Sequence, residues 1–301
     1  MKKHIKTVEI KGFYALSLCL FLAFLTPCSE SRAEAKTIAV SDYHLKLLIQ
    51  EISPETEVIF PFKTSGDPHH YEPPLNAIKS FLNAQYKILN RTDDGWRKGL
   101  EKKLKDQKGA RKQSLVLNPL APYEKKSIKQ FSSHALAHFW LNPIVGCHYY
   151  EIIKNYLTER EFKVSALSKC PYEVSENFQN TMRNFPWHQV ILTHDASIGL
   201  FSELAKEKIF VLKNSDHAGQ IGLIQLKQLY QLSAEDQKKP LLWLVESQLD
   251  LPTRVESRIR KFDHVIKIDT VGKDLKASGQ IIQDIQKQVL KLQQGLADAK
   301  N

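Results

Sequence analysis

The chain has 301 residues, of which 42% are hydrophobic and 25% charged, so it carries enough apolar material for a full globular core and for two domains. Its formal net charge is +10 at pH 7. The lysines are scattered over helix-like stretches, with no basic stripe interleaved with aromatic residues and no helix-turn-helix or RNP signature. We therefore expect a solvated basic surface and no nucleic-acid partner.

The N-terminus has the pattern of an export signal. A lysine-rich start leads into an apolar run from Tyr14 to Leu25, and small residues at Ala33 and Ala35 favour cleavage near that point. The run is shorter than the about 20 apolar residues that a membrane-spanning helix needs. A lipid anchor at Cys28 is disfavoured, because the residue directly before this cysteine is a proline. We assign residues 1–35 to a signal peptide and expect a periplasmic protein.

Removal of that segment would leave two cysteines, Cys147 and Cys170. In an oxidising compartment two such cysteines often pair. Each also lies in a helix-like amphipathic stretch, where separate buried thiols are common. The sequence leaves both states open and slightly favours separate thiols.

Strands and helices alternate through the first half of the remaining chain. Apolar runs and period-two patterns predict strands, and apolar residues spaced by three and four predict helices. The predicted order is a strand at 36–40, a helix after Ser41, a strand at 57–62, a helix at 74–84, a strand at 86–90, a helix at 95–106 and a strand at 114–120. Such alternation is typical of a parallel sheet covered by helices.

The middle of the chain differs, because two helical stretches at 143–157 and 165–185 follow each other with no strand between them. Alternation then resumes. The second half predicts strands at 189–195, 209–213, 240–247 and 264–269, helices at 197–207, 223–233 and 254–262, and a closing helix around 281–296.

The predicted fold class is therefore α/β, with two lobes that each hold a mainly parallel sheet covered by helices. We place the N-terminal lobe at 36–164, a linking helix at 165–185 and the C-terminal lobe at 186–301. Ligands of open parallel sheets bind outside the carboxyl ends of the strands, and clefts between domains are common sites, so we expect the site there.

Four candidate metal ligands lie just after a predicted strand or in a loop. They are His69 in "GDPHHYEP", His138 in "LAHFWLNP", His194 in "ILTHDAS" and Asp269 in "VIKIDTVG". Two come from each half of the chain. Three neutral imidazoles and one carboxylate suit tetrahedral zinc, whereas magnesium or calcium would favour a set made mainly of carboxylates and carbonyls.

These stretches, together with "LLWLVESQ", closely resemble the motifs of the periplasmic zinc- and manganese-binding proteins of ABC importers, the ZnuA/TroA-like family. The resemblance covers nearly the whole chain after residue 35, in the same order. It implies two α/β lobes, a rigid linking helix, a metal held between the lobes, and delivery of that metal to an ABC permease. It also implies that the ligands are His69, His138, His194 and Asp269.

The matched motifs also contain departures. Leu136 and Ala137 stand where the family has Asp-Pro, and Asn142 replaces a closing Asp. The histidine at His194 resembles the zinc-type members, since manganese-type members usually carry glutamate there. We expect Zn²⁺ as the transported ligand, with Mn²⁺ as the alternative.

Two functions from other classes compete with this interpretation. A zinc hydrolase would need an open metal position and a nearby general base such as Glu72 or Glu246. No HExxH motif is present, and four protein ligands leave no evident place for substrate. A surface adhesin of the same fold would need display at the cell surface. We expect a monomeric binding protein that is not an enzyme.

Overall fold

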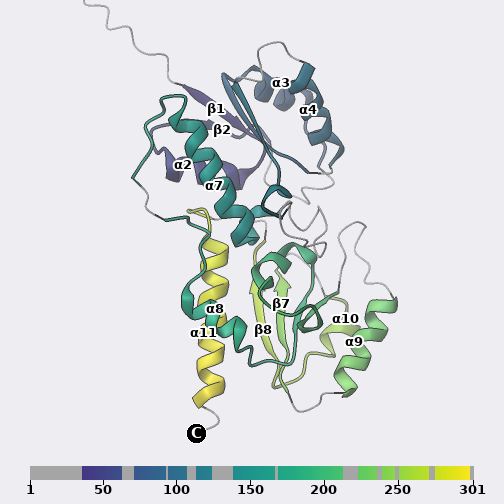
Figure 1. Ribbon diagram of the computed structural model, residues 1–301. Helices are drawn as coiled ribbons and strands as arrows, with labels where there is room; N and C mark the ends of the chain where they lie inside the picture. Colours follow the sequence, from purple (N-terminus) through teal and green to yellow (C-terminus); the bar gives the residue numbers. More distant parts are fainter. Residues whose placement is uncertain are drawn as a thin grey trace, which may run out of the picture. The chain divides into compact units, whose positions relative to one another are not determined.

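The computed structural model describes residues 36–62, 71–92, 94–106, 113–123, 138–166, 169–212, 223–235, 239–247, 251–270 and 275–298. Residues 36–301 form one compact unit, and the description below concerns this unit alone (Figure 1). Within the described residues, no helix has the length and apolar character that crossing a membrane requires.

The first sheet holds four strands in the order β2-β1-β3-β4, and every neighbouring pair is parallel. The strands are β1 (Thr37–Val40), β2 (Glu57–Ile59), β3 (Tyr86–Asn90) and β4 (Ser114–Leu117). Successive side chains of a strand point to opposite faces. Ile38 and Val40 therefore pack on one face, and Ala39 packs on the other.

Helices cover both faces of this sheet (Figure 1). The face of Ile38 and Val40 packs against α2 (Tyr43–Ile52) and α7 (Pro143–Thr158). The opposite face packs against α3 (Leu75–Asn83) and α4 (Gly95–Asp106). Burial on both faces explains why these strands are nearly continuous apolar runs.

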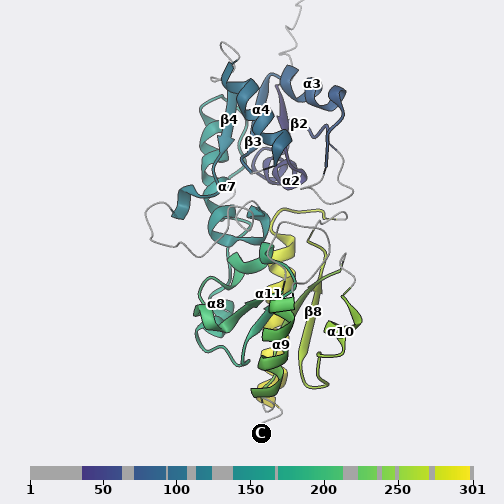
Figure 2. The same cartoon turned by 90° about the vertical axis from the view of Figure 1, so that its right-hand side faces the viewer.

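The second sheet repeats the plan, with four parallel strands in the order β6-β5-β7-β8. The strands are β5 (Val190–Leu192), β6 (Ile209–Val211), β7 (Leu242–Glu246) and β8 (His264–Ile268). Leu242 and Leu244 face the side covered by α8 (Glu176–Arg183) and α11 (Gln280–Asp298). Trp243 and Val245 face α9 (Leu223–Glu235) and α10 (Thr253–Glu256). Figures 1 and 2 both show α11 alongside β8 and α8.

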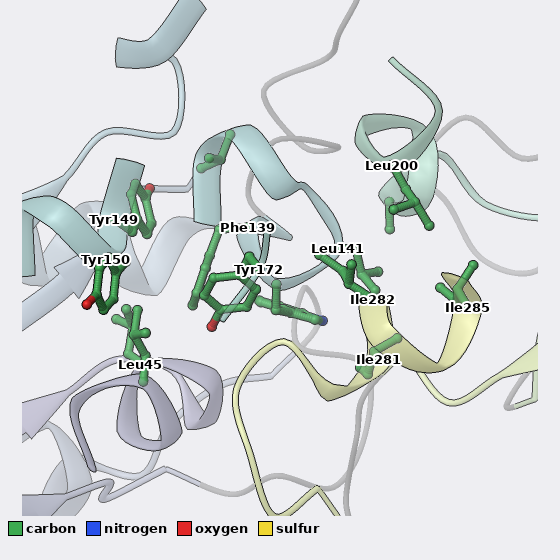
Figure 3. Packing of buried hydrophobic residues seen from close by; sticks show 14 of the residues in the cluster. Leu45, Phe139, Leu141, Tyr149, Tyr150, Tyr172, Leu200, Ile281, Ile282 and Ile285 are labelled. Carbon is green, nitrogen blue, oxygen red and sulfur yellow. The ribbon is translucent and has the colours of Figure 1, made fainter. Parts of the chain in front are cut away.

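The predicted fold class is confirmed, and one apolar cluster extends across both sheets. It includes Val40 of the first sheet and Leu244 of the second, with side chains of α7 and α11 between them. Figure 3 shows part of it, where Phe139 lies beside Tyr172 and Leu141 lies beside Ile282 of α11. The two halves therefore share buried surface instead of meeting only through a linker.

Several predicted helices are shorter in the structure. The stretch predicted at 165–185 is helical only at α8, and Ser175 begins this helix by accepting a hydrogen bond from the Phe178 amide at 3.2 Å. Pro171 cannot continue a helix that starts earlier, because it has no N–H to donate. The stretch predicted at 197–207 forms two short 3₁₀ helices, η3 (Asp195–Phe201) and η4 (Lys206–Lys208). The helix predicted at 254–262 ends after one turn, as α10.

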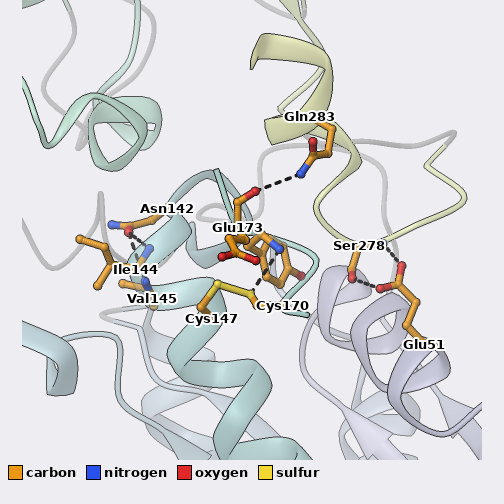
Figure 4. Close-up of a disulfide and its surroundings, with 10 residues drawn as sticks. Glu51, Asn142, Ile144, Val145, Cys147, Cys170, Glu173, Ser278 and Gln283 are labelled. Carbon is orange, nitrogen blue, oxygen red and sulfur yellow. Dashed lines mark hydrogen bonds between the residues drawn. A yellow bond between two sulfur atoms is a disulfide. The ribbon is translucent and has the colours of Figure 1, made fainter. Parts of the chain in front are cut away.

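The two cysteines form a disulfide, which corrects the slight preference of the sequence for separate thiols. Cys147 lies in α7 and Cys170 lies in the segment before α8, with their Cα atoms 5.5 Å apart (Figure 4). That separation is within the usual range for a disulfide. The segment between the two sheets is thus bonded covalently to α7, the helix that packs on the first sheet.

A second connection joins the start of α11 to the first half of the chain. Ser278 donates from both its amide and its hydroxyl to the Glu51 carboxylate, at 2.6 Å each (Figure 4). The next residue, Gly279, has a φ of +70°, and a Cβ there would lie 2.1 Å from the carbonyl oxygen of Pro171. Only glycine fits this position without displacing the backbone.

Candidate metal site

The candidate site in the second half is built at the carboxyl ends of neighbouring strands. In a parallel sheet these ends lie at one edge. Leu192 of β5 pairs with Leu244 of β7, and Glu246 of β7 pairs with Ile268 of β8. His194 follows β5 after one intervening residue, and Asp269 follows β8 directly. Because β7 lies between these strands, the sheet places the two residues on either side of Glu246.

His138 comes from the first half, immediately before the 3₁₀ helix η2 (Phe139–Leu141). All three residues of η2 are buried, which fixes the backbone that carries His138. The side chain of Asn142 then begins α7 by accepting hydrogen bonds from the Ile144 and Val145 amides at 3.1 and 3.2 Å. Asn142 thus has a capping role at the position where the resembling family carries Asp.

His138 and His194 are brought together. Their ring centroids lie 5.8 Å apart and their planes are perpendicular. Two imidazoles that bind one zinc ion through Zn–N bonds of about 2 Å would have ring centroids roughly 5–6 Å apart. The observed pair is compatible with two ligands of a single ion.

His194 is held between two carboxylates. Its Nδ1 lies 3.3 Å from Glu246 Oε1, and its Nε2 lies 3.6 Å from Asp195 Oδ1. The amide of Ala196 also approaches Nδ1, at 3.4 Å. The three side chains are largely buried, with 9–12% of each side chain exposed.

Asp269 is exposed and directly follows β8. The next residue, Thr270, is hydrogen-bonded to the segment that carries His138. The indole Nε1 of Trp140 donates to the carbonyl oxygen of Thr270 at 2.9 Å. The same indole stacks on His44 of α2, with centroids 4.0 Å apart. Trp140 therefore joins the loop after β8 to the first half of the molecule, one residue beyond Asp269.

His69 lies outside the described residues. Within the described part of the chain, no three His, Cys, Asp or Glu side chains are grouped closely enough to hold a metal ion. The structure thus brings the rings of His138 and His194 together and places Asp269 next to Thr270, which accepts a hydrogen bond from Trp140. The role of His69 stays a prediction.

The carboxyl edge of the first sheet serves a different purpose in the described residues. Arg97 of α4 pairs with Asp42 at 2.7 Å and with Asp94 at 2.5 Å, and all three side chains are buried. Nearby, the hydroxyl of Tyr149 donates to Asn90 at 2.8 Å. Burial, and then the charge of Asp42, raise the pKa of Tyr149 well above its ordinary value, so the phenol stays protonated. This network joins α4 and α7 to the carboxyl ends of β1 and β3.

Glu246 is the residue at this site that the sequence does not assign to metal binding. Reasoning from the sequence considered it only as a possible general base of a hydrolase. Its position at the end of "LLWLVES", between two strands that each precede a candidate ligand, is the one signal that could have indicated more.

The sequence matches no known protein-family model and no curated protein. Similar folds do occur among solved structures. The Zn(II)-bound form of an AdcAII variant from Streptococcus pneumoniae has a TM-score of 0.55 at 17% identity, over 86% of this chain and 97% of its own. The chain shares the fold of this solved structure.

Two further structures show the same relationship. The periplasmic zinc-binding protein TroA from Treponema pallidum has a TM-score of 0.56 at 13% identity, over 86% of this chain and 99% of its own. The SBP FpvC from Pseudomonas aeruginosa, solved with Mn²⁺, has a TM-score of 0.53 at 12% identity, over 88% of this chain and 100% of its own. The resemblance to this group, first seen in the motifs, is confirmed at the level of the fold.

Proposed function

We propose that this protein is an extracytoplasmic solute-binding protein that captures Zn²⁺ and delivers it to the membrane permease of an ABC importer. Mn²⁺ is the second candidate ion. The observation that carries the proposal is the perpendicular pair of His138 and His194, which come from different halves of the chain and have ring centroids 5.8 Å apart. The solved structures of similar fold, which include proteins with bound zinc and manganese, support it.

The proposed ligands are His69, His138, His194 and Asp269. Three imidazoles and one carboxylate form an N₃O set that suits zinc. Because His138 precedes η2 and His194 follows β5, a metal held by both would link the two halves of the molecule. A set with four protein ligands leaves no open position for substrate, so we propose a binding protein and not an enzyme.

The decisive test is calorimetric titration of chelator-treated protein with zinc. We expect one ion per chain, with strongly reduced affinity in His138→Ala and His194→Ala. A matched control is His188→Ala, because His188 lies just before β5 and His194 just after it. Equal binding by wild type and all three variants would contradict the proposed site, and absence of zinc binding by the wild type would contradict the function.

Delivery needs a separate test in cells. Deletion of the gene should impair growth in zinc-depleted medium, and both added zinc and the wild-type gene should restore it. The His194→Ala gene should not restore growth. If that variant restores growth fully, capture at this site does not serve transport.

A further inference from the structure

Glu246 ends β7 at the centre of the candidate site. Leu192 of β5 pairs with Leu244 of β7. His194 and Glu246 each lie two residues after one member of this pair, so they are neighbours at the ends of adjacent strands. On the other side, Glu246 pairs with Ile268, the residue before Asp269. A side chain at this position can reach groups at both neighbouring strand ends.

The side chain of Glu246 is largely buried, and one of its two oxygens is without a hydrogen-bond partner among the described residues. Only 11% of its side chain is exposed, and Oε1 has no hydrogen-bond partner among the described residues. Its one recorded ionic contact there is His194 Nδ1, at 3.3 Å. A buried carboxylate with no fixed cation costs folding free energy, so its presence is better explained by a role at the site than by stability.

We propose that Glu246 positions His194 for metal binding by accepting the proton-bearing Nδ1–H, so that the lone pair of Nε2 faces the metal. This inference rests on the proposed function. A neutral imidazole carries one N–H and one lone pair, and a carboxylate can only accept. An Nδ1–H directed at Glu246 therefore leaves Nε2 as the ligating atom, an arrangement common for metal-bound histidines.

Two neighbours favour the opposite tautomer. The Ala196 amide approaches Nδ1 at 3.4 Å and would need the lone pair there. Asp195 lies 3.6 Å from Nε2, on the side where a metal would bind. The amide makes a hydrogen bond of 3.4 Å, at the long end of the range, and the Asp195 distance exceeds that range. Glu246 Oε1 lies at 3.3 Å without hydrogen-bond geometry in this arrangement, and we expect it to prevail because a charged acceptor makes the stronger interaction. Glu246 therefore decides which nitrogen carries the proton.

The test compares Glu246→Leu and Glu246→Gln with wild type, by zinc calorimetry and by ¹⁵N NMR of the His194 ring in the apo and zinc-loaded proteins. Leucine removes the acceptor, and glutamine keeps an acceptor oxygen without the charge. We expect zinc affinity to fall about 10- to 100-fold in Glu246→Leu and by less in Glu246→Gln. The wild-type apo ring should carry its proton on Nδ1, and Glu246→Leu should shift it towards Nε2.

A purely structural role would give another result, because loss of a structural contact would lower apo stability without changing the tautomer. The matched control is Glu203→Gln, an exposed glutamate of the same half, which should leave both readouts unchanged. Wild-type tautomer and affinity in Glu246→Leu would overturn the inference while the proposed function stands. A loss far above 100-fold, with one oxygen ligand missing from the zinc X-ray absorption spectrum, would also overturn it by making Glu246 a ligand. Failure of the wild type to bind zinc would instead sink the proposed function, and the tautomer measurement would still judge Glu246.

Discussion

At the scale of single residues, the adjacent pair His69 and His70 gives the sharpest test of the ligand assignment. Both lie outside the described residues, and the sequence alone carries the assignment: a proline at 68 limits its own φ and the residue before it, which predicts a constrained approach to His69. We propose that His69 faces the metal and that His70 points elsewhere.

His69→Ala should therefore lower zinc affinity by more than the roughly 10- to 100-fold that loss of an outer partner costs, and His70→Ala should stay within that range. The apo melting temperature of both variants should remain close to wild type, because the two α/β cores bury their apolar surface without metal. Titration calorimetry of the two variants measures the difference. Greater damage from His70→Ala would show that the first ligand is misassigned.

His264 offers a residue-scale prediction about pH. It accepts a hydrogen bond from the Trp187 indole at 2.8 Å through Nδ1, which must be unprotonated. Burial lowers the pKa of His264, and this effect outweighs the opposing charge of Asp263. Between the folded pKa and the unfolded value of about 6.5, the unfolded chain binds more protons. The stability contributed by this contact is thus present above pH 6.5 and is lost as the pH falls through the folded pKa.

His264→Asn keeps an acceptor oxygen and removes the titration. The free energy of unfolding, measured by urea denaturation of metal-free protein, should fall less between pH 7.5 and pH 5 in this variant than in wild type. Part of the slope should remain, because burial also lowers the pKa of His148. An unchanged slope would show that His264 does not carry the effect.

At the scale of elements, two glycines, one just before α11 and one within it, have opposite requirements. Gly279 precedes the helix with a φ of +70° and would place a Cβ 2.1 Å from the Pro171 carbonyl oxygen, whereas Gly295 lies within the helix with open space around it. Gly279→Ala should cost at least about 1–3 kcal/mol from backbone strain alone. Gly295→Ala should stabilise by up to about 1 kcal/mol, because alanine is the better helix former. Denaturant unfolding of both variants tests this, and similar effects at the two positions would contradict it.

The elements also show what the sequence could and could not predict. The eight strands of the described residues were predictable because parallel strands covered on both faces are nearly continuous apolar runs, as at 190–192 and 242–246. The stretch at 165–185 was predicted too long, because its amphipathic spacing continues on both sides of Pro171, which cannot continue a helix, and α8 begins only after Ser175. The disulfide of Cys170 was not predicted, because spacing alone does not show that Cys147 lies within reach.

The same limit applies to the candidate site. The motifs predicted His138 and His194, and the structure places their rings together. The role proposed for Glu246 depends on a buried oxygen with no hydrogen-bond partner among the described residues. Neither spacing nor residue type reveals that property, because it arises from the packing of three strand ends.

At the scale of the whole molecule, the apolar cluster shared by both sheets should make the two halves unfold together. Ile285 of α11 is fully buried in this cluster. Ile285→Ala should cost about 2–5 kcal/mol and should lower the unfolding midpoints of both halves equally. Hydrogen exchange of the β3 and β7 amides as urea is raised follows each half separately. Midpoints that separate in wild type or in the variant would show that the halves unfold independently.

The bond between Cys147 and Cys170 joins residues 23 positions apart in the sequence. Because disulfides form in oxidising compartments, its presence indicates that a molecule has entered such a compartment. Under the proposed assignment of residues 1–35 as a signal peptide, a molecule kept in the reducing cytosol would retain all four cysteines as thiols, and all four would react with an alkylating reagent under denaturing conditions. In an exported and processed molecule, Cys19 and Cys28 would be gone and the remaining two would be unreactive. Counting alkyl groups by intact mass would therefore separate newly made from delivered protein in a single sample, without fractionating the cell.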